Sequence, residues 1–385
     1  MNPQHPARKE GPGVALMLAL SLAVCRQVLA VEHYALQWAT YLGGSDYEHA
    51  RDVCTDAQGN VYVVGGTRST NFPIVGGTPF HRGPRTDPNG NELKDAFVAK
   101  FSPAGQLLWA TWLGGSGNDS QEASIRLDKD NNVFVLPYTL SADAPTTAGA
   151  HDRTYNSGAD YYLAKLSPDG RQLLYGTYLG GSGDEYLNTH NLAVDREGNA
   201  YISVSTGSTN FPTTPGAYDR SYNGGAIDWG IAKFSSTGTL LASTFIGGSG
   251  ADNPDGIYVD DRGNVFCTGA SDSPDFPTTA GAYQATKGAG MDAVLVRLKN
   301  DFTGLLYGTF IGGAANEDGR SGYLDAAGQC YIVGQSPGAG WPVVNAYQAT
   351  YAGGALDCIL AKFAPPNPAL RRRSPNNENG ASHLN

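Results

Sequence analysis

A pattern of alternating apolar and polar positions recurs five times along the chain. Its clearest copy is LLYGTYLGGS, and similar segments are LQWATYLGGS from Leu36, LLWATWLGGS from Leu107, LLASTFIGGS from Leu240 and LLYGTFIGGA from Leu305. In LLYGTYL apolar residues occupy both parities, with Leu173 and Tyr175 on one face and Leu174 and Tyr178 on the other. A strand that is apolar on both faces must be covered on both, so each copy predicts a buried β-strand.

Three further landmarks follow each copy in the same order. They are an aspartate with a turn and a strand (DREGNAYISV), a loop containing proline (STNFPTTPGAY) and an apolar strand (DWGIAKF). The aspartates are Asp56, Asp128, Asp195, Asp260 and Asp325. We expect each to cap its turn by accepting backbone hydrogen bonds, so that a hairpin forms around it. The loop prolines exclude a central strand at their positions, which leaves four strands in each unit.

Five units of four strands predict an all-β protein. Neighbouring sheets would cover each other's faces and radial closure would protect their edges, so we expect a β-propeller of five blades with four antiparallel strands each. The last unit stops at DCILAKF without a fourth strand, whereas the first copy has no unit before it. We therefore expect residues 36–42 to complete the last blade and close the ring. A solenoid is the alternative, although neither end shows a polar capping unit.

The ends of the chain have a different composition. Basic residues precede an apolar run from Gly13 to Cys25 and the small residues that end at Ala30, an order typical of a secretory signal peptide. We expect residues 1–30 to be the signal, 31–364 the propeller and 365–385 a disordered tail rich in Pro, Asn and Ser. The mature protein would be extracytoplasmic with no transmembrane segment. Lipidation at Cys25 is the less favoured alternative, because Val24 is bulkier than the residue usual before a lipidated cysteine.

Composition and charge limit the classes of partner that the chain can bind. The chain has 51 glycines and 21 tyrosines among 385 residues, which suits a protein rich in turns and strands. Its formal net charge of -10 argues against nucleic acid as a partner, because phosphate contacts need a basic surface. Four cysteines remain after signal cleavage. Cys330 and Cys358 could form a disulfide on consecutive strands, and two buried thiols are an equally good interpretation.

The landmarks LLYGTYLGGSGDE, DREGNAYI, STNFPTTPGAY and DWGIAKF together resemble the SBBP repeat, a bacterial β-propeller repeat. The resemblance extends from Leu36 to Phe363. It implies a propeller fold and a location at the cell surface, and it carries no catalytic residue onto this sequence. The five units seen here differ from the seven blades for which the family is known.

Polar residues at the entry of the predicted innermost strands are the candidate ligand-binding site. Placed around an axis they would form a mixed ring at the channel mouth, on the face of the long loops, where binding residues are common. They are His49, Arg51, Asp52, Glu122, His190, Asn191, Asp255 and Arg320. The alternative is that these groups only solvate a channel filled with water.

The sequence favours a monomeric, non-catalytic binding or interaction module whose ligand is a glycan or a protein. The alternatives are an extracytoplasmic hydrolase or lyase that uses the mouth residues, and a purely structural surface protein. No nucleophile elbow or metal-binding helix motif is present in the sequence. We expect no cofactor. Calcium is a weaker alternative, because each GGSG loop supplies too few carboxylates for the six to eight oxygens that calcium prefers.

Overall fold

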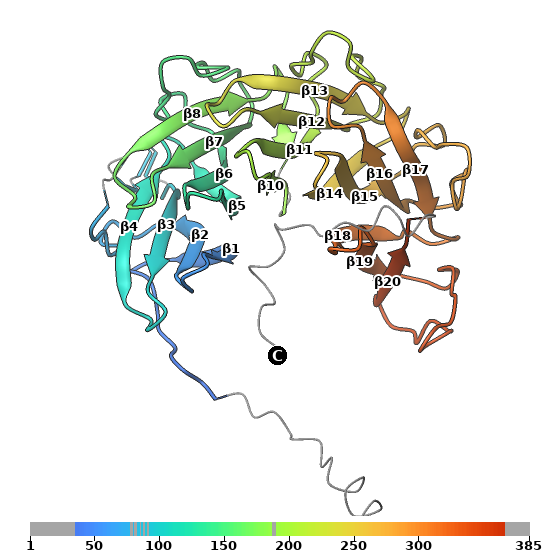
Figure 1. The fold of residues 1–385 in the computed structure, drawn as a ribbon, viewed down its shortest axis with the longest axis horizontal. Helices are drawn as coiled ribbons and strands as arrows, with labels where there is room; N and C mark the ends of the chain where they lie inside the picture. Colours follow the sequence, from blue (N-terminus) through green and yellow to red (C-terminus); the bar gives the residue numbers. More distant parts are fainter. Residues whose placement is uncertain are drawn as a thin grey trace, which may run out of the picture. The chain divides into compact units, whose positions relative to one another are not determined.

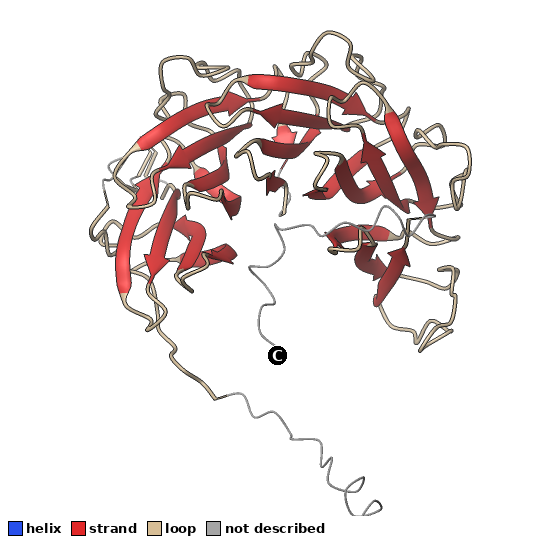
Figure 2. Ribbon diagram, viewed as in Figure 1, coloured by secondary structure: helices blue, strands red, loops and turns tan. Residues whose placement is uncertain are grey.

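The structure is a computed structural model that describes residues 35–77, 80, 83–84, 86–87, 89–90, 92–186 and 190–365. The expected signal peptide, and the tail from residue 366, lie outside the described residues. The chain divides into two compact units, Met1–Ala39 and Thr40–Asn385. Every strand of the described residues belongs to the second unit, and no helix occurs among them (Figure 2).

The strands form five antiparallel sheets, which we number I to V in chain order. Sheet I contains β1 (Glu48–Thr55), β2 (Val61–Thr67), β3 (Asp95–Phe101) and β4 (Leu107–Leu113). Sheet II contains β5 (Asp119–Leu127), β6 (Val133–Thr139), β7 (Asp160–Leu166) and β8 (Leu173–Leu179). Sheet III contains β9 (Glu185–Tyr186), β10 (Leu192–Val194), β11 (Ala200–Thr206), β12 (Asp228–Phe234) and β13 (Leu240–Ile246). Here the first strand is divided into β9 and β10, which both pair with β11.

The last two sheets differ in strand number. Sheet IV contains β14 (Asp252–Val259), β15 (Val265–Ser271), β16 (Asp292–Leu298) and β17 (Leu305–Ile311). Sheet V contains only β18 (Asp318–Leu324), β19 (Cys330–Ser336) and β20 (Asp357–Phe363). Within the second unit, the first strands lie on the inner side of their sheets and the fourth strands on the outer side (Figure 1). The predicted all-β class and the predicted strands are therefore confirmed, apart from the strand at 36–42.

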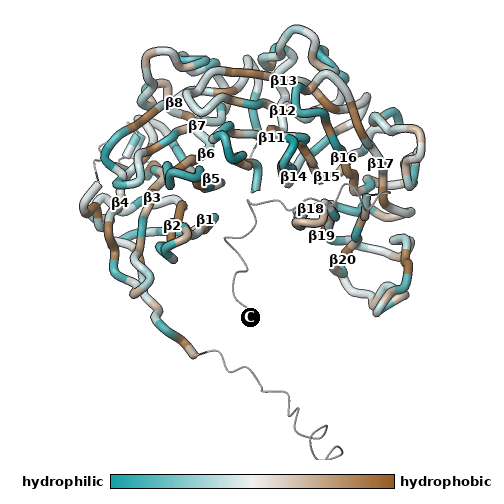
Figure 3. The backbone as a smooth tube through the Cα atoms, viewed as in Figure 1, coloured by the Kyte–Doolittle hydropathy of each residue, from teal (hydrophilic) through white to brown (hydrophobic). Residues whose placement is uncertain are grey.

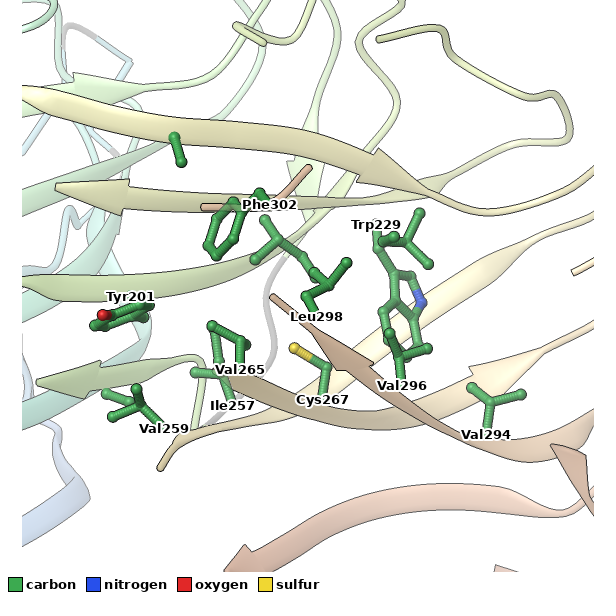
Figure 4. Close-up of a cluster of buried hydrophobic side chains, with 14 of the residues drawn as sticks. Tyr201, Trp229, Ile257, Val259, Val265, Cys267, Val294, Val296, Leu298 and Phe302 are labelled. Atoms are coloured by element: carbon green, nitrogen blue, oxygen red, sulfur yellow. The ribbon is translucent and has the colours of Figure 1, made fainter. Parts of the chain in front are cut away.

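The hydrophobic cores lie between consecutive sheets, apart from one cluster around Phe97 that belongs to sheet I alone. One core joins sheets III and IV through Tyr201, Trp229, Cys267 and Val296, all fully buried (Figure 4). Similar cores join sheets I and II, II and III, and IV and V. Burial of one large apolar side chain stabilises the fold by roughly 1.5–3 kcal/mol, so each sheet depends on the neighbour that covers it.

The repeated aspartates cap the turns as expected. The Asp195 carboxylate accepts hydrogen bonds from the amide nitrogen and side-chain amide of Asn199, at 2.8 and 2.7 Å, and from the Tyr201 hydroxyl at 2.9 Å. The same amide contacts recur at Asp56, Asp128, Asp260 and Asp325. Because these contacts fix the turn between the first two strands, they set the register of each sheet.

Sheet V has an unpaired edge. Its outermost strand, β20, leaves Leu360 70% exposed, whereas the equivalent β16 of sheet IV is almost entirely buried. The expected strand at residues 36–42 is not formed, because those residues have no regular secondary structure and pair with no strand. The strand pairing therefore does not confirm closure of the five sheets by this segment.

The cysteine pair that the sequence left open is not a disulfide. Cys330 is buried and Cys358 exposed, and both are free thiols. In the pairing of β19 with β20, Cys330 stands opposite Phe363 while Cys358 stands opposite Gln335. The two residues lie at opposite ends of the strand pair, which is too far for a bond between their sulfur atoms.

Candidate functional site

Every sheet interrupts its first strand at the same place. The register shifts between Ala50 and Asp52 in β1, Asp119 and Ala123 in β5, Pro254 and Gly256 in β14, and Asp318 and Ser321 in β18. In sheet III the gap between β9 and β10 falls at the same point. A bulge bends the strand and redirects its side chains, which is why bulges are common beside functional sites.

The interruptions carry ionisable candidates in all five sheets. These residues are Arg51, Glu122, His190, Asp255 and Arg320, one from each sheet. The hydropathy colouring of the backbone shows hydrophilic residues along the inner strands β5 and β14 (Figure 3). Each sheet therefore has a polar side chain on its innermost strand. The alternation of side chains in a regular strand would not by itself place a polar group at this position.

A first network joins sheets I, II, IV and V. The Arg51 Nη2 atom lies 3.0 Å from Glu122 Oε1, and Arg320 Nε lies 3.4 Å from Asp255 Oδ2. Arg320 also contacts Asp318 through Nη1 at 3.3 Å. Burial raises the pKa of Asp255 to about 8; Arg320 opposes this shift, whereas Asp318 and Glu122 add to it. Burial therefore favours the protonated form of Asp255, whereas the ion pair with Arg320 favours its carboxylate.

A second network joins sheets I, II and III. The Asp52 Oδ2 atom accepts from Arg126 Nη1 at 2.5 Å and from the amide nitrogen of Ile125 at 3.0 Å. The pKa of His190 is lowered by burial and by Arg126, while Asp52 opposes the shift. His190 has a positive φ of 67°, an uncommon conformation for a residue with a side chain, and its buried Nδ1 makes no hydrogen bond. The neutral imidazole is therefore held in a strained position beside an ion pair.

The other two candidates lie differently. Asn191 is fully buried, and its side-chain amide donates to the Tyr161 hydroxyl at 3.1 Å, so it supports sheet packing. His49 is half-buried, and its ring centroid lies 5.3 Å from that of Tyr47.

Two charged residues of these networks were missed by the sequence analysis. Arg126 occupies a strand position where the other units carry Cys54, Ala193, Tyr258 and Tyr323. A charge at a position that is otherwise uncharged in the repeat is the signal that could have identified it. Asp318 lies at the end of the loop that the sequence analysis weighed as a calcium ligand. The bulge in β18 places it beside Arg320, and the sequence alone does not show this contact.

The accessible charges of the first network are mainly cationic. The Arg320 side chain is 60% exposed, whereas the carboxylate of its partner Asp255 is 9% exposed. In the other pair Arg51 is 34% exposed and Glu122 22%. Guanidinium groups present planar sets of donors that match carboxylate, sulfate and phosphate oxygens. The arrangement can therefore receive an anionic group from solvent.

A separate cavity of about 570 Å³ lies between sheets IV and V. Its walls include Leu306, Tyr307, Cys330, Phe363 and Arg297. In sheet IV, Leu305 at the start of the fourth strand stands opposite Leu298 at the end of the third. Phe363 is the residue of sheet V equivalent to Leu298, so the cavity lies where a fourth strand of sheet V would begin.

The part of the chain that the structure describes has neither a cluster of metal-binding side chains nor a helix that could span a membrane. No group of three or more His, Cys, Asp or Glu side chains there is arranged to hold a metal ion. No helix among the same residues has the length and apolar character required to cross a membrane.

Comparison with protein families matches the sheet pattern to a known repeat. The profile of SBBP, described as a beta-propeller repeat, matches residues 37–73, 174–212 and 243–277. The chain contains SBBP beta-propeller repeats. The second and third SBBP matches begin in the fourth strand of one sheet, β8 or β13, and continue through the first two strands of the next. The sequence repeat is thus out of phase with the sheets and spans the junction between them.

Individual proteins are only distantly similar. An uncharacterized WD repeat-containing protein, L264, of Acanthamoeba polyphaga mimivirus is 24% identical over an alignment of 290 residues that covers 62% of this chain. The chain spans about a fifth of the length of that curated relative, since the match covers 20% of it.

Solved structures that show similarity to this chain include a protein of unknown function from Dyadobacter fermentans. It has a TM-score of 0.41 and 13% identity, with 77% of this chain and 78% of that chain covered. A polysaccharide lyase of family PL25, an ulvan lyase, has a TM-score of 0.44 and 12% identity, with 84% and 71% covered.

Proposed function

We propose that this chain is an exported β-propeller protein that acts as a non-catalytic binding module through the charged rim of its inner strands. The observation that carries the proposal is the interruption of all five first strands at the same place, with an ionisable side chain at each. Groups that only solvated a channel would not require a bulge in every sheet, since exposed positions of a regular strand would suffice.

The charge distribution favours an anionic ligand. Arg51 and Arg320 are the most exposed ionised groups of the first network, and their carboxyl partners are more deeply buried. The ligand we favour is a glycan that carries carboxylate or sulfate groups. An acidic protein segment would present similar oxygens, and the experiment separates these two sources.

The test uses the mature protein, residues 31–385, on an array of neutral and acidic glycans and in titrations with acidic peptides. We expect acidic glycans to bind, and the Arg51→Ala, Arg320→Ala double variant to bind at least about tenfold more weakly, since a hydrogen bond to a charged group contributes about 1.5–3 kcal/mol. Arg196→Ala is the matched control, because Arg196 is an exposed arginine in the turn at the opposite end of an inner strand.

Unchanged binding by the double variant, at an unchanged melting temperature, would show that the rim is not the site. Binding of acidic peptides alone would assign the same rim to a protein partner. Absence of binding to either class would contradict the module and leave a structural role.

A hydrolase or lyase is the second candidate, and Asp255 is the observation that favours it. A buried carboxyl group whose pKa is raised to about 8 is suited to general acid catalysis. Cleavage of a bound acidic polysaccharide, abolished by Asp255→Asn without loss of binding, would establish this role in place of the non-catalytic one.

We also propose that the five sheets are the blades of one ring, closed within a monomer by residues 36–42. The first SBBP match begins at residue 37, and the equivalent residues of the other two matches form β8 and β13. Leu36 and Tyr41 of this segment are exposed, Leu36 to 83%, while β20 offers an unpaired edge. Export rests on the signal-like sequence of residues 1–30, and its test is the N-terminal sequence of the secreted protein.

A further inference from the structure

Each junction between consecutive sheets buries two carboxyl groups. One comes from the first residue of a third strand, and the other from the start of the next sheet's first strand. The pairs are Asp95 with Asp119, Asp160 with Glu185, Asp228 with Asp252, and Asp292 with Glu317, and every member is at most 1% exposed. Burial of two ionised carboxylates side by side is strongly unfavourable, so these pairs require an explanation.

The pair Asp160 and Glu185 has one oxygen with no other protein partner. Asp160 Oδ2 accepts from the amide nitrogen of Asn156 at 2.9 Å, while the buried Asp160 Oδ1 has no other hydrogen-bond partner. Asp160 Oδ1 and Glu185 Oε2 both face the Cα of Gly180, where an added methyl group would collide with them. The two carboxyl groups act directly on each other: burial raises the pKa of Asp160, and Glu185 lowers it. Two carboxyl groups can form a hydrogen bond only when one of them carries a proton.

The next junction repeats this arrangement with Asp228 and Asp252. Asp228 Oδ2 accepts from the amide nitrogen of Asn223 at 2.5 Å, and its buried Oδ1 has no hydrogen-bond partner. Asp252 Oδ2 accepts from Ser273 Oγ at 2.7 Å and from the amide nitrogen of Gly248 at 2.8 Å. The free oxygen of Asp228 and the Oδ2 atom of Asp252 both face Gly247. In both pairs, therefore, the Oδ1 atom of the third-strand aspartate has no hydrogen-bond donor.

Among the residues that the structure describes, the charged groups that act on these two pairs include no cation. Asp152 is the other charged group that acts on Asp160, and Asp219 and Asp275 are those that act on Asp228 and Asp252. All three are acids, so their negative charges oppose the ionisation of the carboxyl groups in the two pairs. The junction of Asp292 differs, because Lys287 stabilises that carboxylate.

A metal ion fits these pairs poorly. Most carboxyl oxygens of the two pairs already accept from amide or hydroxyl donors, including Thr206 Oγ1, which donates to Glu185 Oε1 at 2.7 Å. Calcium would need six to eight oxygen ligands, and a pair with one free oxygen cannot supply them. A proton, in contrast, requires only the free aspartate oxygen and the nearby oxygen of the partner carboxyl group.

We infer that the pairs Asp160–Glu185 and Asp228–Asp252 are proton-binding sites, each of which holds one proton between its two carboxyl groups at neutral pH. Burial, augmented by the neighbouring carboxylate, raises the pKa of Asp228 to about 7 and raises that of Glu185 well above its ordinary value. The folded protein therefore binds protons that the unfolded chain releases above pH 5. The free energy of unfolding must fall as the pH rises from about 5 to 8.

The test compares the wild type with the Asp160→Asn, Asp228→Asn double variant in thermal melts between pH 5 and 9. Each asparagine can direct its Nδ2 to the partner carboxylate while its oxygen accepts from Asn156 or Asn223, so it replaces the shared proton. We expect the melting temperature of the wild type to fall by several degrees over this range and that of the variant to fall less. Asp169→Asn, in an exposed turn, is the control and should follow the wild type.

Infrared spectroscopy gives a readout that does not depend on stability. The wild type at pH 7 should show the carbonyl band of protonated carboxyl groups, and the double variant should lose part of it. Equal pH dependence of wild type and variant, or absence of that band, would overturn the inference. A melting temperature that rises with added calcium in the wild type only would overturn it in favour of a cation site.

Discussion

At the scale of single residues, the repeated side chains maintain the turns and the irregular ones form the candidate site. Asp195 and its four counterparts could be assigned from sequence, because a carboxylate before a Gly-Asn turn has one local role. Arg51 and Arg320 were also predicted as site residues together with their partners Glu122 and Asp255, but the pairing was not. The Arg320 contact with Asp318 depends on a bulge, and pattern reasoning cannot locate an extra residue within a strand.

Replacement of Asp195 by alanine should lower the free energy of unfolding by about 2 kcal/mol, because the amides of Asn199 and the buried hydroxyl of Tyr201 lose their acceptor. Urea denaturation monitored by tyrosine and tryptophan fluorescence measures the change. Asp169→Ala, in an exposed turn, serves as the reference and should alter stability much less. Equal effects of the two substitutions would show that the Asp195 cap is not an important contributor.

At the scale of elements, the periodicity of the sequence predicts a strand, and the twenty strands of the described residues form where a neighbour covers them. The segment 36–42 has the same pattern as β17 but forms no strand, because no edge is paired with it. Local sequence therefore predicts which residues can form a strand, while tertiary contact decides whether they do. The edge of β20 is the contact that this segment lacks.

The proposed closure predicts a specific register between residues 36–42 and β20. In sheet IV, Ala293 stands opposite Ile311, and the equivalent residues are Cys358 in β20 and Leu42 in the N-terminal segment. Because opposed residues of antiparallel strands are close enough for a disulfide, Leu42→Cys should form an intramolecular disulfide with the exposed thiol of Cys358 under mild oxidation. Peptide mapping by mass spectrometry measures its yield.

Thr40→Cys is the matched control, since residue 40 would stand opposite Leu360 and should give much less of the bond. A disulfide-linked dimer in place of the monomer would show that the strand is exchanged between two chains. Equal yields from Leu42→Cys and Thr40→Cys would contradict the register.

At the scale of the whole molecule, the junctions show why a closed ring would be favourable. Glu48 and Asp357 occupy the positions of the paired junction acids in the first and last sheets, yet both are only partly buried. Closure would bring them together as a fifth pair and would cover the apolar surface beside Leu360. The sequence predicts five units and closure of the ring by residues 36–42, and closure requires that the five inter-sheet angles add up to a full turn.

Deletion of residues 36–44 from the mature protein should therefore be far more damaging than its length suggests. The strand that completes sheet V would be lost, and β20 would keep an unpaired edge beside an open cavity, so we expect a melting temperature lower by about ten degrees or more and association through that edge. Calorimetry and light scattering measure both effects. Deletion of residues 31–34, which leaves the segment intact, should change neither, and a 36–44 deletion that stayed monomeric and equally stable would mean that the five sheets stand without closure.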